Sequence, residues 1–359
     1  MQFRMVRQVA VLAALGLATL GTSSPAQVQV PTVTVAGVGY VNYAYQLRTD
    51  SSIVPVGHGN NFDVARAYIR ALGKFAGGVQ TQITIDVDGR KAATNQQTFR
   101  LKYAFVSWTP ENSHLTYKLG AVHTPWLDWE ENLNDYRMQG TMPMERAGYV
   151  SSSDFGFAVD GMWNYDAVAT QIGVYNGEGY GNAPGDANKV VSGRFSVRLA
   201  HSDLAGKTGG LRLNAYGEIG QSTGGGSRMR YIGMLSYKSK AVTLAAQIGG
   251  AQDSTSAATP KLKGQVLAAY GVYNIPNSKV AVIGRVDQFD PNTDSTAATA
   301  ATRIAVNKQT RVIAGLSYVV SANLRVLADV DLNSIAGGSP TNAFDKTRQT
   351  FYFHTEFKF

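Results

Sequence analysis

The chain has 359 residues, a formal net charge of +8 at pH 7 and no cysteine. Its mean hydropathy of −0.13 is too polar for a bundle of membrane-spanning helices, and beyond the N-terminal segment no apolar run approaches the ~18 residues that a spanning helix needs. The 38 glycines, 18 tyrosines and 14 phenylalanines are typical of a β-rich chain with aromatic girdles and close backbone contacts. Without cysteine, disulfide bonds are excluded as a source of stability.

The first 26 residues have the pattern of a secretory signal peptide. Two arginines precede an apolar run from Val9 to Leu20, and the small residues Ser24 and Ala26 stand at the expected cleavage site. This run is too short for a membrane-spanning helix, which needs about 20 residues. We therefore expect residues 1–26 to be removed on export and residues 27–359 to form the mature domain.

From Val33 onward, strand-like segments alternate with connections that are by turns long and short. Val79 to Asp88 shows this most clearly, because apolar and polar side chains alternate strictly along it. An even number of strands with long loops at one end and short turns at the other predicts an all-β, closed antiparallel barrel. About sixteen segments fit this pattern: Val33–Leu47, Phe62–Phe75, Val79–Asp88, Thr98–Trp108, Leu115–His123, Asp154–Trp163, Val168–Asn176, Val190–Ala200, Leu211–Gly220, Arg228–Tyr237, Val242–Gly249, Lys263–Tyr273, Lys279–Phe289, Arg311–Tyr318, Leu324–Leu332 and Phe351–Phe359.

The segment from Phe351 to Phe359 places its phenylalanines on one face and most of its polar residues on the other. A terminal Phe preceded by Phe at most alternate positions resembles the C-terminal insertion signal of bacterial outer-membrane β-barrels. We therefore expect this strand to face outer-membrane lipid and to engage the barrel-assembly machinery through Phe359. We also expect it to pair with the segment near Val33 to Tyr43, which would close the barrel around an aqueous channel.

Period-two alternation then assigns side chains to the outer face or to the lumen. On one strand we predict four outward side chains: Phe99, Leu101, Tyr103 and Phe105. The basic residues predicted to line the lumen on this strand and on an earlier one are Arg66, Arg70, Lys74, Arg100 and Lys102. Later inward basic residues are Arg285, Arg311, Arg325 and Arg348, and inward acids include Asp86, Asp287, Asp329 and Glu356. Because basic residues outnumber acids on this face, the sequence predicts a weak anion preference.

The connection from Thr124 to Ser153 is the longest in the chain, at about thirty residues, and such long connections are usually functional. It is too rich in tryptophan, tyrosine and methionine for an exposed loop. We predict that it folds into the lumen and narrows it, while a lid over the outer rim is the alternative. The candidate constriction residues are Asp128, Glu130, Glu131, Arg137, Glu145 and Arg146.

Several motifs between roughly residues 62 and 161 resemble the phosphate-selective (polyphosphate) porin-like family of bacterial outer-membrane proteins. They are Arg66-Ala67-Tyr68-Ile69-Arg70 before Gly73, Tyr103-Ala104-Phe105-Val106, Leu119-Gly120-Ala121 before Pro125, and Met144-Glu145-Arg146. The resemblance implies a sixteen-stranded barrel, usually trimeric, whose third external loop folds inward and whose basic residues guide phosphate. Here that loop has five acidic residues against Arg137 and Arg146, which favours a general porin of the same fold.

Together these observations predict a porin of the bacterial outer membrane, a water-filled channel for passive diffusion of small hydrophilic solutes or ions. A homotrimer is expected from the resemblance. No enzymatic activity, cofactor, metal or nucleic-acid partner is expected, because the five histidines lack metal-ligand spacing and no nucleophile motif appears. Two alternatives remain open: a secreted soluble β-rich glycan-binding protein, and an outer-membrane barrel hydrolase.

Overall fold

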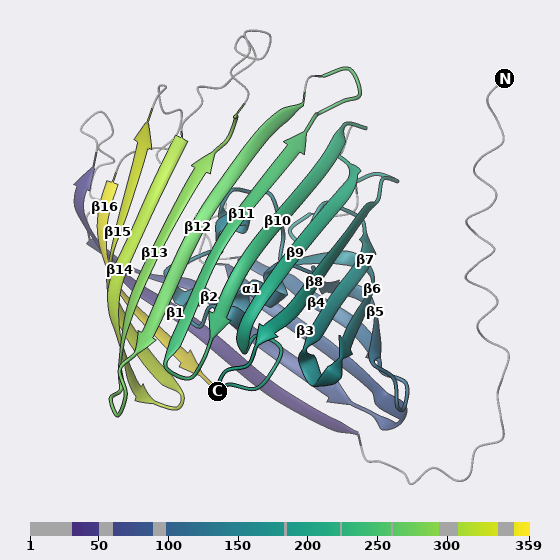
Figure 1. Cartoon of the computed structure of the whole chain (residues 1–359), viewed down its shortest axis with the longest axis horizontal. Coiled ribbons are helices and arrows are strands. Elements are labelled where there is room, and N and C mark those ends of the chain that lie inside the picture. The colour runs from purple at the N-terminus through teal and green to yellow at the C-terminus, as the bar shows by residue number, and fades with distance from the viewer. Residues whose placement is uncertain are drawn as a thin grey trace, which may run out of the picture.

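The computed structural model describes residues 31–49, 60–88, 98–182, 185–222, 225–259, 261–293, 308–336 and 348–359. The predicted signal peptide lies outside these residues. The described strands form one closed antiparallel barrel, in which each strand pairs with its sequence neighbours and the first pairs with the last (Figure 1). The strands are β1 (Thr32–Thr49), β2 (Asn60–Lys74), β3 (Val79–Asp88), β4 (Thr98–Trp108), β5 (Leu115–His123), β6 (Ser153–Trp163), β7 (Val168–Tyr175), β8 (Val190–Ala200), β9 (Gly210–Gln221), β10 (Ser227–Lys238), β11 (Val242–Asp253), β12 (Leu262–Asn274), β13 (Val280–Asp290), β14 (Lys308–Ser321), β15 (Leu324–Ala336) and β16 (Arg348–Lys358). The predicted barrel and its predicted strands are confirmed.

Within the described residues, helical structure is confined to short elements between strands. The connection between β5 and β6 contains α1 (Leu127–Leu133), the 3-10 turn η2 (Arg137–Gln139) and α2 (Pro143–Arg146), and two further 3-10 turns are η1 (Ala76–Gly78) and η3 (Asn164–Asp166). At η1, Gly78 has φ +78°, and a Cβ there would lie 2.0 Å from the carbonyl oxygen of Thr109, so only glycine fits this turn. Among the described residues, no helix combines the length and apolarity needed to cross a membrane.

The barrel closes between β1 and β16, as the sequence predicted. Gly39 pairs with Phe357, and the amide of Gly37 donates a 2.9 Å hydrogen bond to the carbonyl of Phe359. A Cβ on Gly37 or Gly39 would lie 2.2 Å or 2.3 Å from a ring carbon of Phe359 or Phe357, respectively. The two glycines therefore leave room for the aromatic rings at the seam, and closure leaves no unpaired sheet edge.

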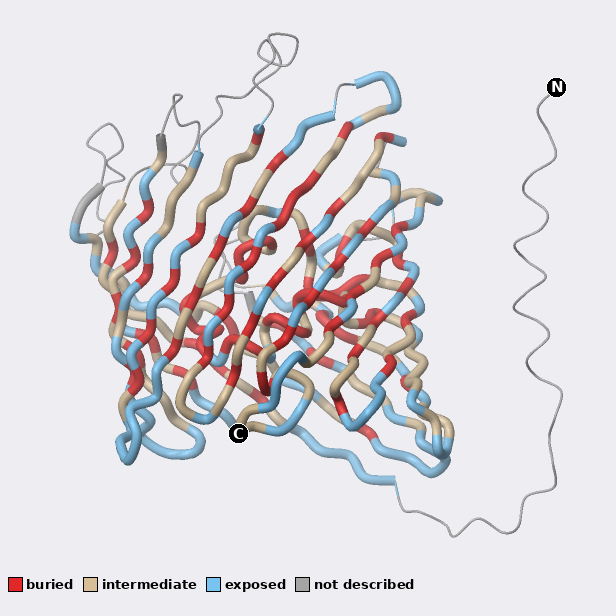
Figure 2. The backbone as a smooth tube through the Cα atoms, viewed as in Figure 1, coloured by how far each residue is buried: buried red, intermediate tan, exposed pale blue. Residues whose placement is uncertain are grey.

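Buried and exposed residues alternate along the strands (Figure 2). On β9, for example, the side chain of Arg212 is fully buried, whereas its neighbour Leu213 is 51% exposed. Ile69 and Ile83 are likewise among the exposed apolar residues. The outer face of the barrel is thus apolar, and the opposite face of the strands, which we call the polar face, carries most of the charge.

This alternation is interrupted within β4. In its pairing with β3, Ile85 is opposite Leu101 and Thr84 is opposite Tyr103, so Lys102 is an extra residue. Such a β-bulge shifts the register by one residue, and side chains beyond it change faces.

The bulge makes two of our predictions wrong. Phe99 and Leu101, before the bulge, are exposed as predicted, but Tyr103 is buried and stacks on His123 with ring centroids 3.9 Å apart. Phe105, also predicted outward, packs against a buried apolar cluster. Lys102, which the alternation predicted to point inward, is buried.

Candidate functional site

The long connection of residues 124–153 packs on the polar face of the barrel strands. Its residues Trp126, Leu127, Trp129 and Leu133 are fully buried in one apolar cluster. The wall contributes side chains from β9, β10, β11 and β12 to this cluster: Tyr216, Ile232, Met234, Ala245, Val266 and Tyr270. The apolar content that marked this connection in the sequence is therefore buried against the barrel wall.

Two glycines of the wall make room for the part of this connection near α2. A Cβ at Gly249 of β11 would lie 2.4 Å from the sulfur of Met144, and one at Gly264 of β12 would lie 1.7 Å from the Tyr149 hydroxyl. These distances are shorter than van der Waals contact, so a side chain at either position would displace the connection. No sequence signal marked these two positions, because glycine is frequent throughout the chain.

Basic side chains of the wall donate hydrogen bonds to backbone carbonyls of the connection. The bonds run from Arg194 to Pro125 (3.0 Å), Arg230 to Tyr149 (2.9 Å), Lys238 to Leu133 (2.9 Å), Arg285 to Thr141 (3.0 Å) and Arg311 to Gln139 (3.3 Å). Buried carbonyls outside regular structure need such donors. Many inward basic residues therefore hold this connection in place. A count of inward basic residues is thus larger than the number of positive charges that a permeating ion would meet.

The acidic residues of the connection are mostly neutralised by nearby cations. Asp128 pairs with Lys207 at 3.2 Å, and Arg137 pairs with both Glu131 (2.9 Å) and Glu145 (2.8 Å). Burial alone would raise the pKa of Asp128 and Glu131, but Lys207 and Arg137 outweigh it and hold both pKa values below their usual range. The acidic excess of the sequence thus produces little net field.

Glu130 differs from its neighbours because it has no basic partner in hydrogen-bonding range. Its side chain is fully buried, one carboxyl oxygen accepts a 2.8 Å hydrogen bond from the indole of Trp126, and the other has no partner within the described residues. Burial raises the pKa of Glu130 to about 8, although Arg285 opposes the shift. The carboxyl is therefore protonated at pH 7.

Arg66 and Arg100 converge on one buried carboxylate. Asp86 accepts hydrogen bonds from Arg66 at 3.0 Å and from Arg100 at 2.9 Å. The hydroxyl of Tyr180, from the connection between β7 and β8, lies 3.1 Å from the same Asp86 oxygen. Period-two alternation placed the three charged residues on the polar face, but nothing in the sequence pointed to Tyr180, which lies in a glycine-rich connection.

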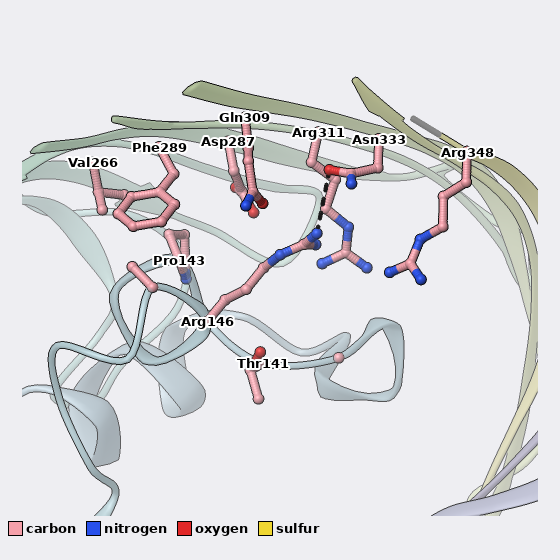
Figure 3. Close-up of a pocket in the computed structure, with 12 residues that line it drawn as sticks. Thr141, Pro143, Arg146, Val266, Asp287, Phe289, Gln309, Arg311, Asn333 and Arg348 are labelled. Atoms are coloured by element: carbon pink, nitrogen blue, oxygen red, sulfur yellow. Dashed lines mark hydrogen bonds between the residues drawn. The ribbon is translucent and has the colours of Figure 1, made fainter. Parts of the chain in front are cut away.

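At least three cavities adjoin the long connection. The smallest, of 130 Å³, has three carboxylates and one cation among its described lining residues: Asp154, Glu178, Glu218 and Arg228. The two larger cavities carry the predicted site residues. A cavity of 370 Å³ has four cations and two carboxylates among its described lining residues: Arg70, Lys102, Arg137, Lys358, Asp128 and Glu131. The ammonium of Lys102 lies 4.5 Å from the ring centroid of Tyr68 in this cavity. The second cavity, of 420 Å³, is lined by Arg146, Arg311, Arg348 and Asp287 among others (Figure 3).

The structure therefore brings together five of the predicted site residues, at the 370 Å³ cavity: Arg70, Lys102, Asp128, Glu131 and Arg137. Arg146 lines the 420 Å³ cavity. Lys74 is exposed at the end of β2 and Glu130 is buried beside Trp126, and neither is among the lining residues of these two cavities. Within the described residues, no group of three or more acidic or histidine side chains could hold a metal ion.

No protein-family model matches this sequence, and no curated protein matches it. Solved structures match its fold. The anion-selective porin from Comamonas acidovorans is 11% identical with a TM-score of 0.66, and the match covers 92% of this chain and 100% of that one. OmpF of Salmonella typhi, in complex with daunomycin, is 13% identical with a TM-score of 0.65, covering 91% and 97%. The outer membrane channel DcaP of Acinetobacter baumannii is 10% identical with a TM-score of 0.62, covering 94% and 99%.

At these identities the similarity concerns the fold, which is the closed antiparallel barrel of the porins. Since no family model matches, the resemblance to the phosphate-selective family stays a prediction.

Proposed function

We propose that the chain is a porin of the bacterial outer membrane, a water-filled channel for passive diffusion of small hydrophilic solutes and ions. The observation that carries this proposal is a closed barrel with an apolar outer face and a charged opposite face. Closure pairs the backbone polar groups of every strand, which a bilayer requires. A soluble glycan-binding protein would have no reason to expose so many apolar side chains. No observation in the described residues favours a hydrolase.

Residues 124–153 would lie within the lumen and narrow it. In support, hydrogen bonds join this connection to strands spread around the wall, from β8 at Pro125 to β14 at Gln139. A lid over the rim would instead contact strand ends. Removing residues 127–133 should therefore raise single-channel conductance in planar bilayers while the barrel remains folded. Unchanged conductance would favour the rim position.

A weak anion preference, which would extend to phosphate, is supported by the charges at the two larger cavities, of 370 Å³ and 420 Å³, while the 130 Å³ cavity is acidic. Among the described lining residues of each larger cavity, cations outnumber carboxylates, and rings of basic residues favour anions in pores. The preference is weak because Asp128 and Glu131 lie at the same cavity as Lys102 and Arg70. Charges farther than about 8–10 Å from an ion contribute little at ordinary ionic strength.

Reversal potentials across a planar bilayer in a potassium chloride gradient test this preference. We expect the sign of an anion-selective channel in the wild type, and a shift toward cations in Lys102→Gln and Arg70→Gln. Lys74→Gln is the matched control, because Lys74 is basic and on the same strand as Arg70 but lines neither cavity. A cation preference of the wild type would contradict the proposal.

We also propose that the barrel-assembly machinery recognises the Phe359 strand and that the chain forms a homotrimer. In support, the similar OmpT of Vibrio cholerae is described in a trimer form, at 11% identity and a TM-score of 0.62, with coverage of 92% and 99%. Light scattering of the detergent-solubilised protein, corrected for bound detergent, would give the mass of three chains. A mass of one chain would overturn the trimer.

A further inference from the structure

The 420 Å³ cavity has an apolar end and a cationic end (Figure 3). The apolar end includes Val266 of β12 and Phe289 of β13, which are cross-strand neighbours. Pro143 and Ala147 of the long connection also line this cavity. Phe289 is held by an edge-to-face contact with Tyr149, with ring centroids 5.7 Å apart. This end offers contact to an apolar group.

The cationic end continues along the next strands. Arg311 of β14 pairs with Asn333 of β15, which in turn pairs with Arg348 of β16. Arg146 reaches toward this row from α2, and its guanidinium donates a hydrogen bond of 3.4 Å to the side-chain oxygen of Asn333. Three guanidinium groups from three elements therefore border one end of the cavity.

The carboxylates near this end are already engaged. Asp331 accepts three hydrogen bonds from Arg311, of 2.9 Å, 3.0 Å and 2.7 Å, and Asp287 accepts two from Arg285, of 2.9 Å and 2.6 Å. Arg146 makes no ion pair within the described residues. Arg146 therefore brings to the cavity a positive charge that the carboxylates Asp287 and Asp331, paired with Arg285 and Arg311, do not neutralise.

Electrostatics around Arg146 agree with this charge excess. Burial, followed by repulsion from Arg311, lowers the pKa of Arg146 to about 9, so the group is still protonated at pH 7. An anion placed between Arg146 and Arg311 would relieve that repulsion. A planar carboxylate suits the fork of a guanidinium better than a spherical ion does.

We propose that this cavity binds an organic carboxylate with a small apolar body, such as an aromatic monocarboxylate. The carboxylate would lie between Arg146 and Arg311, and the apolar body would lie against Phe289 and Val266. Inorganic anions would leave the apolar end in water, and neutral apolar solutes would leave Arg146 without an anion. The volume is within the range of about 300–1,000 Å³ common for small-molecule sites. This proposal rests on the proposed channel function, since the channel would bring the solute to the cavity.

Isothermal titration of the full chain, folded in detergent, tests the site with benzoate as the probe. At constant ionic strength, we expect benzoate to bind at least tenfold more tightly than inorganic phosphate or benzyl alcohol. Arg146→Gln and Phe289→Ala should each weaken benzoate binding by about tenfold, equivalent to about 1.4 kcal/mol. Arg70→Gln, which removes a cation of the 370 Å³ cavity, should leave it unchanged.

Phosphate binding as tight as benzoate binding would overturn the proposal, because the apolar end would then contribute nothing. An unchanged affinity of folded Arg146→Gln would also overturn it. Mobility on unheated gels shows whether each variant is folded, and Arg146→Lys, which keeps the charge but not the fork, should bind with intermediate affinity.

Potassium chloride conductance of the same preparations separates this proposal from the channel. Conductance without benzoate binding would refute the carboxylate site and leave the channel intact. Benzoate binding without conductance would support the site and refute the channel. With both present, benzoate should reduce the single-channel current of the wild type more than that of Arg146→Gln.

Discussion

The protonated carboxyl of Glu130 should make the stability of this protein fall as the pH rises. Its pKa is about 8 in the folded chain against an ordinary value of 4.5. Between pH 4.5 and pH 8 the folded state binds more protons at Glu130 than the unfolded state does. The contribution of Glu130 to the free energy of unfolding is therefore fully present below pH 4.5 and is lost as the pH rises through about 8. A pKa difference of one pH unit between the two states is worth about 1.4 kcal/mol, which gives an upper bound of roughly 5 kcal/mol for this group.

Glu130→Gln removes the titrating group and keeps an oxygen that accepts the hydrogen bond from Trp126. We expect the variant to match the wild type at pH 5 and to unfold at a higher denaturant concentration than the wild type at pH 9. Urea unfolding in detergent, followed by tryptophan fluorescence, measures both, and Trp126 and Trp129 lie beside the site. Glu131→Gln is the matched control on the same helix.

The control should behave in the opposite way. The pKa of Glu131 is lowered, because the ion pair with Arg137 outweighs burial, so its stabilisation is present above its ordinary pKa and is lost as the pH falls. Glu131→Gln should therefore destabilise the protein at pH 7 and pH 9 and have less effect at acid pH. If the difference between Glu130→Gln and the wild type were the same at pH 5 and pH 9, the buried protonated carboxyl would be refuted.

Two further predictions concern close contacts of glycine and the barrel seam. Gly249→Ala should lower the free energy of unfolding by about 1–3 kcal/mol, because the added Cβ would overlap Met144. Gly217→Ala is the control and should lower it less, because no atom lies within 4 Å of the Cβ added there. Urea unfolding of the two variants measures the difference. Phe357→Asp, which places a charge on the lipid face, and deletion of Phe359, which removes the terminal recognition residue, should each abolish membrane assembly. Outer-membrane fractionation measures this, and normal insertion of both variants would contradict it.

The sequence by itself determined the barrel, its strand number and most side-chain orientations. These follow from a local rule, because a period of two separates two environments along every strand. Arg212 and Leu213 obey it, as do the buried Glu356 and the exposed Phe357 at the seam. The rule failed in β4 beyond Lys102, because a bulge inserts one residue without a sequence signature.

Only the tertiary structure decided which charges are neutralised and which groups surround a cavity. Glu130 and Glu131 are adjacent acids on one short helix, yet one is protonated beside an indole and the other is ionised beside Arg137. Similarly, Arg146 and Arg311 come from distant parts of the chain and meet at one cavity. Charge state and partner depend on burial and on contacts between distant segments, and barrel closure with the packing of residues 124–153 creates those contacts.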